Sequence, residues 1–153
     1  MKKVLFLHGL ESKPGGSKVK HLRELGYEVL NPALPDSSYE KSVIIAQRLI
    51  DEEKPVAVIG SSRGGAIAMK VNIHDAKLVL IAPAWKIYNE EVRSLPSDTV
   101  ILHSENDDIV PIEDSEKLVE NWGVSLLKVG ECHRMHDEEA LYEIGVTVNN
   151  MCG

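Results

Sequence analysis

Short apolar segments alternate with longer amphipathic ones along the chain, and this alternation constrains the fold more than any other feature. The apolar segments are rich in β-branched residues and lie at 3–8, 27–31, 56–61, 77–83, 99–104 and 124–129. Most are continuously apolar, which is typical of strands buried on both faces of a sheet. Several of the segments between them have apolar residues at helical spacing; the helical segments predicted are 17–26, 38–54, 62–71, 112–123 and 136–151.

Strands that alternate with helices predict βαβ units, and right-handed crossovers place helices on both faces of a parallel sheet. We therefore expect a three-layer α/β/α sandwich with about six mostly parallel strands. A length of 153 residues suits a single domain, 1–153, with one sheet and its helices. In such sheets a ligand site lies beyond the carboxyl ends of the strands, so functional residues should follow strand ends.

Composition and charge exclude several classes of protein. Apolar residues make up 43% of the chain and charged residues 27%, a balance typical of a globular protein. The formal net charge of −7 argues against a nucleic-acid or anionic-membrane partner, since both require a basic surface. No apolar run approaches the ~18 residues of a membrane span, and the apolar start is too short for a signal peptide. With only two cysteines, Cys132 and Cys152, we expect a cytoplasmic protein.

The stretch I-G-S-S-R-G-G at 59–65 stands where a buried strand should pass into a helix. The pattern G-x-S-x-G fits it in one register only, with Gly60 and Gly64 on either side of Ser62. Glycines at this spacing allow a turn so tight that the central serine adopts a strained conformation and projects its hydroxyl. The backbone N–H of Arg63, at the start of the helix, would then face a developing oxyanion.

Two other interpretations fit this stretch less well. It could be an ordinary small-residue loop in which Ser61 or Ser62 caps the helix, although its position between an apolar run and a helix favours the nucleophile. It could also bind phosphate, but neither G-x-x-x-x-G-K-[ST] nor G-x-G-x-x-G occurs there.

An acid and a histidine follow the next strand ends in the order that such a serine requires. H-S-E-N-D-D-I-V-P spans 103–111, and V-G-E-C-H-R-M-H spans 129–136. We expect Asp107 to orient the base because it leads into Asp-x-x-Val-Pro, with Asp108 and Glu105 as alternatives. His133 is the predicted base, and His136, at the start of a helical segment, is the alternative.

The loop after the first strand, L-H-G-L-E-S, should supply the second oxyanion donor. We assign this donor to the N–H of Leu10, with Glu11 as the alternative. No cofactor or metal is predicted: Cys132, His133 and His136 suggest a C-H-x-x-H zinc site, but no spacing elsewhere offers a partner pair.

Five motifs together resemble the α/β-hydrolase superfamily, and most closely its small YqiA-like esterases. They are L-H-G-L-E-S-K-P (7–14), I-G-S-S-R-G-G (59–65), I-A-P-A (81–84), H-S-E-N-D-D-I-V-P (103–111) and G-E-C-H-R (130–134). The resemblance covers nearly the whole chain. It implies a minimal α/β-hydrolase fold with little or no lid, and hydrolysis of carboxylic esters or thioesters through an acyl-serine. It makes Ser62 the nucleophile, Asp107 the acid and His133 the base.

The chain departs from that pattern at two positions near the site. Arg63 stands where an apolar residue usually follows the nucleophile, and Ser104 replaces a glycine before the acid. We expect the Arg63 side chain to reach solvent or an acid such as Glu11 in a surface ion pair, and otherwise to recognise an anionic group of the substrate. Trp85 follows a strand end and is a candidate wall of the acyl pocket, while 85–97 is the only candidate for a lid.

The leading expectation is thus a serine hydrolase acting on a small-molecule ester or acyl compound. A peptidase or amidase remains an alternative, because the same residues serve any acyl transfer. A non-catalytic binding protein with this fold is the alternative from another class.

Overall fold

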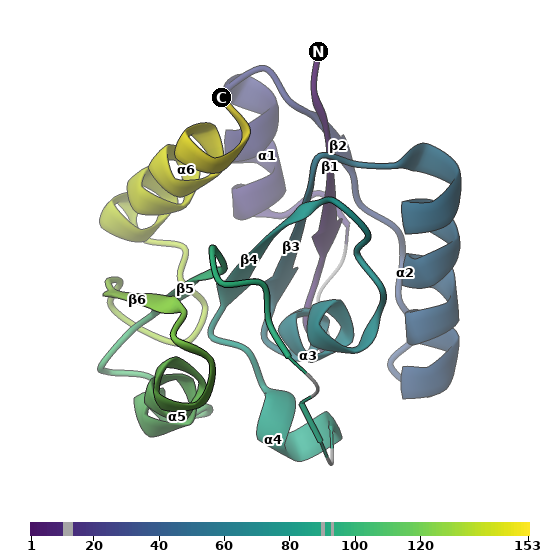
Figure 1. Cartoon of the computed structure of the whole chain (residues 1–153). Helices are drawn as coiled ribbons and strands as arrows, with labels where there is room; N and C mark the ends of the chain where they lie inside the picture. Colours follow the sequence, from purple (N-terminus) through teal and green to yellow (C-terminus); the bar gives the residue numbers. More distant parts are fainter. Residues whose placement is uncertain (11–13, 90, 93) are drawn as a thin grey trace.

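A computed structural model describes residues 1–10, 14–89, 91, 92 and 94–153. Within this part of the chain, a single sheet of six strands lies between two layers of helices (Figure 1). The strands are β1 (Lys3–Leu7), β2 (Glu28–Leu30), β3 (Ala57–Ser61), β4 (Lys77–Ile81), β5 (Val100–His103) and β6 (Ser125–Lys128). The helices are α1 (Ser17–Glu24), α2 (Tyr39–Glu53), α3 (Arg63–Lys70), α4 (Trp85–Tyr88), α5 (Ile112–Trp122) and α6 (Glu138–Cys152).

All strand pairs are parallel, in the order β2-β1-β3-β4-β5-β6. The three-layer fold and the six predicted strands are thereby confirmed. The chain reverses its direction across the sheet between β1 and β3, because β2 adds on one side of β1 and β3 on the other. In open parallel sheets, a crevice forms at the carboxyl ends of the two strands that flank such a reversal. The loops after β1 and β3 are therefore the expected walls of a site.

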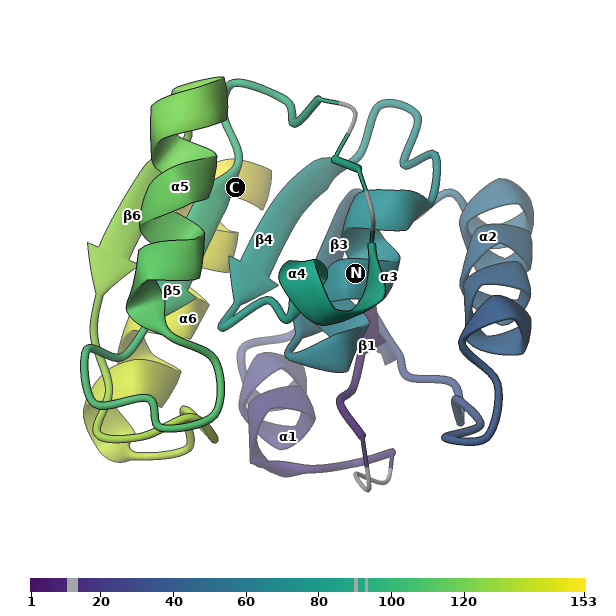
Figure 2. The same cartoon turned by 90° about the horizontal axis from the view of Figure 1, so that it is seen from below.

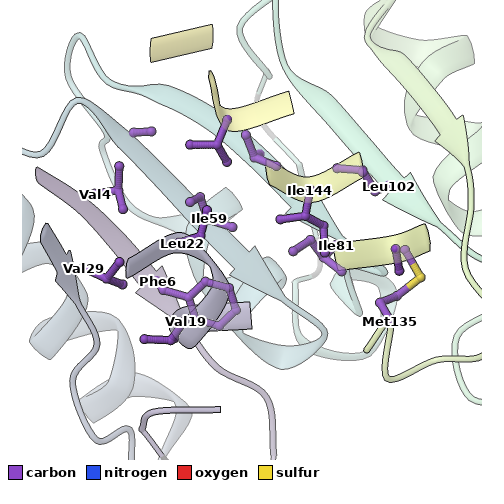
Figure 3. Close-up of a cluster of buried hydrophobic side chains, with 14 of the residues drawn as sticks. Val4, Phe6, Val19, Leu22, Val29, Ile59, Ile81, Leu102, Met135 and Ile144 are labelled. Atoms are coloured by element: carbon purple, nitrogen blue, oxygen red, sulfur yellow. The ribbon is translucent and has the colours of Figure 1, made fainter. Parts of the chain in front are cut away.

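The sheet is buried on both faces because its central strands are apolar at nearly every position. Alternate residues of β1 enter different cores: Val4 and Phe6 face α1 and α6, whereas Leu5 and Leu7 face α2 and α3. Figure 3 shows the first of these cores, in which side chains of α1 and α6 meet those of five strands, β1 to β5. The second core includes residues of α2, α3, α4 and α5.

The helix ends follow from local chemistry. The hydroxyl of Ser38 accepts a hydrogen bond from the N–H of Lys41 at the start of α2, and the carboxylate of Asp137 accepts one from the N–H of Ala140 at the start of α6. Gly123 ends α5 in the left-handed conformation, with φ of 66°. No helix in the described ranges combines the length and apolar character needed to cross a membrane.

Candidate active site

The site lies at the carboxyl edge of the sheet, which Figure 2 shows from below. Strand β3 ends at Ser61 and α3 begins at Arg63, so Ser62 alone makes the turn. Its φ of 56° and ψ of −116° form a strained conformation for a residue with a side chain. Ser62 occupies the N-cap position of α3, but its hydroxyl makes no cap hydrogen bond. The alternative of an ordinary helix cap is therefore wrong.

The flanking glycines are required by close backbone contacts. A Cβ on Gly60 would lie 2.4 Å from the carbonyl oxygen of Gly64, and a Cβ on Gly64 would lie 2.0 Å from that of Leu7. Both distances are far below van der Waals contact with backbone atoms that have little freedom to move. The turn can therefore be this tight, and α3 can lie this close to β1, only with glycine at these positions.

The hydroxyl of Ser62 meets the predicted histidine. Ser62 Oγ lies 2.9 Å from Nε2 of His133, and Nδ1 of the same ring lies 2.6 Å from Oδ2 of Asp107. The His133 side chain is 14% exposed and the Asp107 side chain is fully buried. The imidazole thus stands between a hydroxyl and a buried carboxylate, an arrangement that can move a proton away from Ser62.

Asp107, rather than Asp108 or Glu105, lies against His133. Oδ1 of Asp107 accepts hydrogen bonds from the N–H groups of Ile109 (2.9 Å) and Val110 (2.8 Å). Burial raises the pKa of this carboxyl, but the hydrogen bonds from His133 and the two backbone N–H groups outweigh it, and the pKa lies below its usual value. Asp107 is therefore ionised at neutral pH, while Asp108 is exposed.

The loop that presents His133 is fixed at both ends. Ser104 donates a hydrogen bond to the carbonyl oxygen of Gly130 at 2.8 Å. This bond ties the loop after β5, which holds Asp107, to the loop after β6, which holds His133 and is called the histidine loop below. Gly130 has a φ of 95°, and Met135, two residues after His133, is fully buried. Ser104, noted as a departure from the family pattern, thus connects the two loops. The alternative base, His136, is exposed, and Ser62 lies against His133 instead.

The loop after β1 comes close to the serine. A Cβ on Gly9 would lie 3.2 Å from Cβ of Ser62 and 3.8 Å from its Oγ. Nδ1 of His8 lies 2.9 Å from the carbonyl oxygen of Gly9, and Nε2 lies 3.3 Å from the N–H of Leu34. Because a carbonyl only accepts and an amide N–H only donates, the proton of this ring is on Nδ1. The N–H of Leu10 belongs to the same trans peptide as the Gly9 carbonyl, so it points away from His8.

The side chain of Arg63 does not reach solvent, and the expected surface ion pair is wrong. Arg63 is 2% exposed, and its Nη2 donates hydrogen bonds to the carbonyl oxygen of Pro35 (3.0 Å) and the hydroxyl of Ser42 (3.3 Å). The guanidinium carbon lies 5.6 Å from the ring centre of Tyr39 and 5.8 Å from that of Tyr88, close enough for cation–π attraction.

The guanidinium of Arg63 therefore joins α3 to α2 and α4 inside the molecule. Tyr39 and Tyr88 stack on each other with ring centres 5.0 Å apart, and burial raises the pKa of Tyr39 to about 12. Nη1 of Arg63 is also buried and has no hydrogen-bond partner in the described part of the chain. The expected contact between this side chain and a substrate finds no support in these surroundings.

Trp85 and Glu11 are the other two candidate substrate-binding residues. Trp85 begins α4, is 9% exposed, and donates a hydrogen bond from Nε1 to the carbonyl oxygen of Asp114 at 3.0 Å. It packs in the second core, and these contacts are those of a packing residue rather than of a pocket wall. Glu11, also the alternative oxyanion donor, lies outside the described residues.

A small cavity of about 80 Å³ opens beside the serine turn on the side of α1. Its lining includes Gly9, Ser61, Asn31 and Lys18. Burial lowers the pKa of the Lys18 ammonium to about 8, and Nζ donates a hydrogen bond to the carbonyl oxygen of Arg134 in the histidine loop. Lys18 was not predicted, because a lysine on an amphipathic helix gives no sign in the sequence that it faces a site.

His103 is the other residue whose place the sequence did not predict. It ends β5, is fully buried, and lies 3.0 Å from the carboxylate of Asp107 through Nε2. Its position at a strand end was visible in the sequence, but the spacing did not show that its ring meets Asp107. Among the described residues, no group of three or more His, Cys, Asp or Glu side chains could hold a metal ion.

No protein-family model matches the chain, and no curated protein matches it. Several solved structures have the same fold. A candidate hydrolase of the alpha/beta superfamily from Xanthomonas campestris pv. campestris is 22% identical and superposes with a TM-score of 0.76, covering 99% of this chain and 98% of that one. Alpha/beta hydrolase domain-containing protein 10 from mouse is 16% identical, with a TM-score of 0.77 over 97% of this chain and 88% of that one.

Est1E from Butyrivibrio proteoclasticus is 17% identical, with a TM-score of 0.73 over 97% of this chain and 86% of that one. At these identities the likeness establishes the fold, and the chain has the α/β-hydrolase fold. The narrower resemblance to the YqiA-like esterases stays a prediction.

Proposed function

We propose that this chain is a serine hydrolase that cleaves carboxylic esters or thioesters through an acyl-serine intermediate. The observation that carries the proposal is the unbroken hydrogen-bonded series from Ser62 through His133 to Asp107 at a strained turn. The names of two solved structures with this fold agree with it, since one is called an esterase domain, from Rhodothermus marinus, and another is called a hydrolase, from Agrobacterium vitis.

In the first half of the reaction, Nε2 of His133 takes the proton of the Ser62 hydroxyl, and Oγ forms a bond to the carbonyl carbon of the substrate. Asp107 stabilises the imidazolium that results, because its carboxylate is ionised and lies 2.6 Å from Nδ1. The tetrahedral adduct then breaks its bond to the alcohol or thiol, which leaves with the proton from Nε2. Ser62 is left acylated.

In the second half, a water molecule gives its proton to Nε2 and attacks the acyl carbon. The acid leaves, and the proton returns to Ser62 Oγ. The N–H groups of Arg63 and Leu10 are the proposed donors to the oxyanion in both halves. The position of Arg63 at the first residue of α3 and the orientation of the Gly9–Leu10 peptide by His8 support this role.

The cavity beside the turn favours small acyl groups. This cavity, lined by Gly9 and Ser61 and not by Ser62 or His133, has a volume of about 80 Å³, which is too small for a long lipid chain. We therefore expect acetyl and propionyl esters to react faster than long-chain esters.

A fluorophosphonate probe tests the nucleophile directly. We expect a covalent adduct on the peptide that contains Ser62, and hydrolysis of p-nitrophenyl acetate that falls by at least about 10⁴-fold in Ser62→Ala. Ser61→Ala is the matched control, because it removes the neighbouring hydroxyl and leaves the series intact. A folded protein that forms no adduct at Ser62 would exclude the proposal.

The two alternatives predict different results in the same experiments. A peptidase or amidase would form the adduct at Ser62 but cleave p-nitroanilides faster than the matching esters. A binding protein with this fold would show no ester hydrolysis that depends on Ser62. Side-by-side rates with an ester, a thioester and an anilide of the same acyl group separate the three.

A further inference from the structure

One oxygen of the buried carboxylate lies against two imidazole rings. Oδ2 of Asp107 is 2.6 Å from Nδ1 of His133 and 3.0 Å from Nε2 of His103. His133 is the ring that meets the serine. His103 is fully buried and has no part in the two proton transfers described above.

The partners of His103 fix the position of its proton. Nε2 is also 2.9 Å from the carbonyl oxygen of Val110, which only accepts hydrogen bonds. Nε2 therefore carries a hydrogen and shares it between this carbonyl and Oδ2 of Asp107. On the other side of the ring, Nδ1 lies 2.7 Å from the hydroxyl of Ser115, a fully buried residue of α5 that can donate to it. A neutral ring with its proton on Nε2 satisfies all three partners.

With this proton in place, every hydrogen-bonding position of the Asp107 carboxylate is filled. A carboxylate accepts about two hydrogen bonds on each oxygen. Oδ1 takes its pair from the N–H groups of Ile109 and Val110, and Oδ2 takes its pair from His133 and His103. Three of the four donors hold the acid in place, and the fourth is the base that it orients.

We propose that His103 is a positioning residue that holds Oδ2 of Asp107 toward His133 and shares its negative charge, so that the site contains a series of four side chains, His103–Asp107–His133–Ser62. This inference rests on the proposed function. Among the described residues, no further titratable side chain is hydrogen-bonded to the series; Lys18 is a titratable group that faces the loop carrying His133, where it donates to the carbonyl oxygen of Arg134.

Loss of the His103 donor should have two effects. The carboxylate would be held less firmly, so the turnover number kcat should fall by about tenfold to a hundredfold, with little change in KM. Oδ2 would also keep more of its negative charge and favour the protonated form of His133 more strongly. The acid limb of kcat/KM should then move to higher pH by about half a unit or more.

The test compares His103→Leu with His103→Gln, using p-nitrophenyl acetate over a range of pH. Leucine removes the donor, whereas the amide nitrogen of glutamine can reach Oδ2 and replace it. We expect both effects in the leucine variant and recovery of most of the kcat and the normal acid limb in the glutamine variant. Leu102→Ala is the control for lost packing on the same strand: it should lower the unfolding temperature and leave the acid limb unchanged.

An acid limb in His103→Leu that matches the wild type, or equal failure of the leucine and glutamine variants as folded proteins, would overturn the proposal. A measurement on the unaltered protein covers the case in which the leucine variant does not fold. Long-range ¹H–¹⁵N spectra of the imidazoles should show His103 protonated on Nε2 with a slowly exchanging proton. Protonation on Nδ1 alone would exclude the proposed contact. Because this spectrum needs no turnover, it is independent of fluorophosphonate labelling at Ser62, on which the proposed function depends.

Discussion

One close histidine–aspartate pair lies at the carboxyl ends of the strands, here called the carboxyl edge, and another lies at their amino ends, the amino edge. The two pairs have similar distances but differ in burial. At the carboxyl edge, Nδ1 of His133 lies 2.6 Å from Asp107; at the amino edge, Nε2 of His74 lies 2.8 Å from Asp51. The side chains of His74 and Asp51 are each 54% exposed, whereas that of Asp107 is fully buried. Water therefore screens the amino-edge pair, and the interaction between its two side chains is weak.

The volumes of the cavities at the two edges follow the opposite order: the edge with the exposed pair has the larger cavity. A cavity of about 910 Å³ lies at the amino edge and includes Asp51, His74 and Lys77 in its lining, whereas the cavity lined by Gly9 and Ser61 at the serine turn measures about 80 Å³. Two charged groups of the larger cavity already have partners: Lys77 pairs with Asp98 at 2.7 Å, and Asp51 lies 2.8 Å from His74. Burial of a hydrogen-bonded charge, and not the volume of a cavity, is what distinguishes the edge that can perform acid–base chemistry.

The largest effect should follow from removing the carboxyl-edge imidazole. His133→Ala deprives Ser62 of its proton acceptor, so we expect ester hydrolysis to fall by about 10⁵- to 10⁶-fold. Stability should change little, because the ring is partly exposed. Steady-state kinetics and thermal unfolding measure the two quantities. His136→Ala, an exposed histidine in the next turn of the loop, should retain nearly full activity; a large loss in that variant instead would show that the base has been misassigned.

Neutralising the buried carboxylate should have the next largest effect. Asp107→Asn keeps an oxygen for the N–H groups of Ile109 and Val110 but removes the charge that stabilises the imidazolium, and we expect a loss of about 10³- to 10⁴-fold in kcat. The same change at the other edge, Asp51→Asn, should leave kcat unchanged.

The Asp107→Asn variant should also reveal the pH dependence of stability. Because the fold lowers the pKa of Asp107, the carboxylate stabilises the folded state above its unfolded pKa of about 4, and this contribution disappears as the pH falls through the folded value. The difference in unfolding free energy between wild type and variant should therefore be largest near neutral pH and shrink toward pH ~2. A difference that stays constant with pH would contradict the lowered pKa.

Arg63→Leu should affect stability rather than specificity. The variant loses the hydrogen bonds to Pro35 and Ser42 and the contacts with the two tyrosines, and we expect a loss of about 1–3 kcal/mol in the free energy of unfolding. Since the guanidinium is buried, the ratio of rates with neutral and acidic esters should not change. Denaturant titration and paired substrates measure both. Arg134→Leu, at an exposed arginine of the histidine loop, is the control expected to leave stability unaltered.

The smallest effect is expected at the amino edge. His74→Gln removes a half-exposed ring from a screened pair, so unfolding free energy should change by less than about 0.5 kcal/mol and ester hydrolysis should not change. A clear loss of activity would show that the large cavity communicates with the site, and the contrast between the two edges would then be wrong.

The sequence predicted the layers of the fold because buried parallel strands leave a strong signal. The continuous apolar runs located all six strands to within a few residues, and Ser62, Asp107 and His133 were selected by their places after strand ends. Helix α4 was not predicted, because its four residues carry no helical period. Strand β6 was predicted, but its exposure at the edge of the sheet was not, because its pattern resembles that of the interior strands.

Side-chain direction is what the sequence could not supply. The arginine after the nucleophile was expected in solvent because isolated arginines are rarely buried. The burial of Arg63 is explained only by the tertiary placement of Tyr39 and Tyr88 around α3. His103 gave a similar difficulty. Its contact with Asp107 depends on how the loop between them folds back, and spacing along the chain does not encode that distance.

The conformation of Ser62 has a consequence for how such a chain changes over generations. A φ of 56° with a ψ of −116° is tolerated by glycine and strained by about 1–3 kcal/mol for serine. Selection for stability alone would therefore favour replacing this serine by glycine, and a lineage released from its function should drift that way. The persistence of a serine here, in descendants that have diverged elsewhere, would be a sign that the hydroxyl is in use.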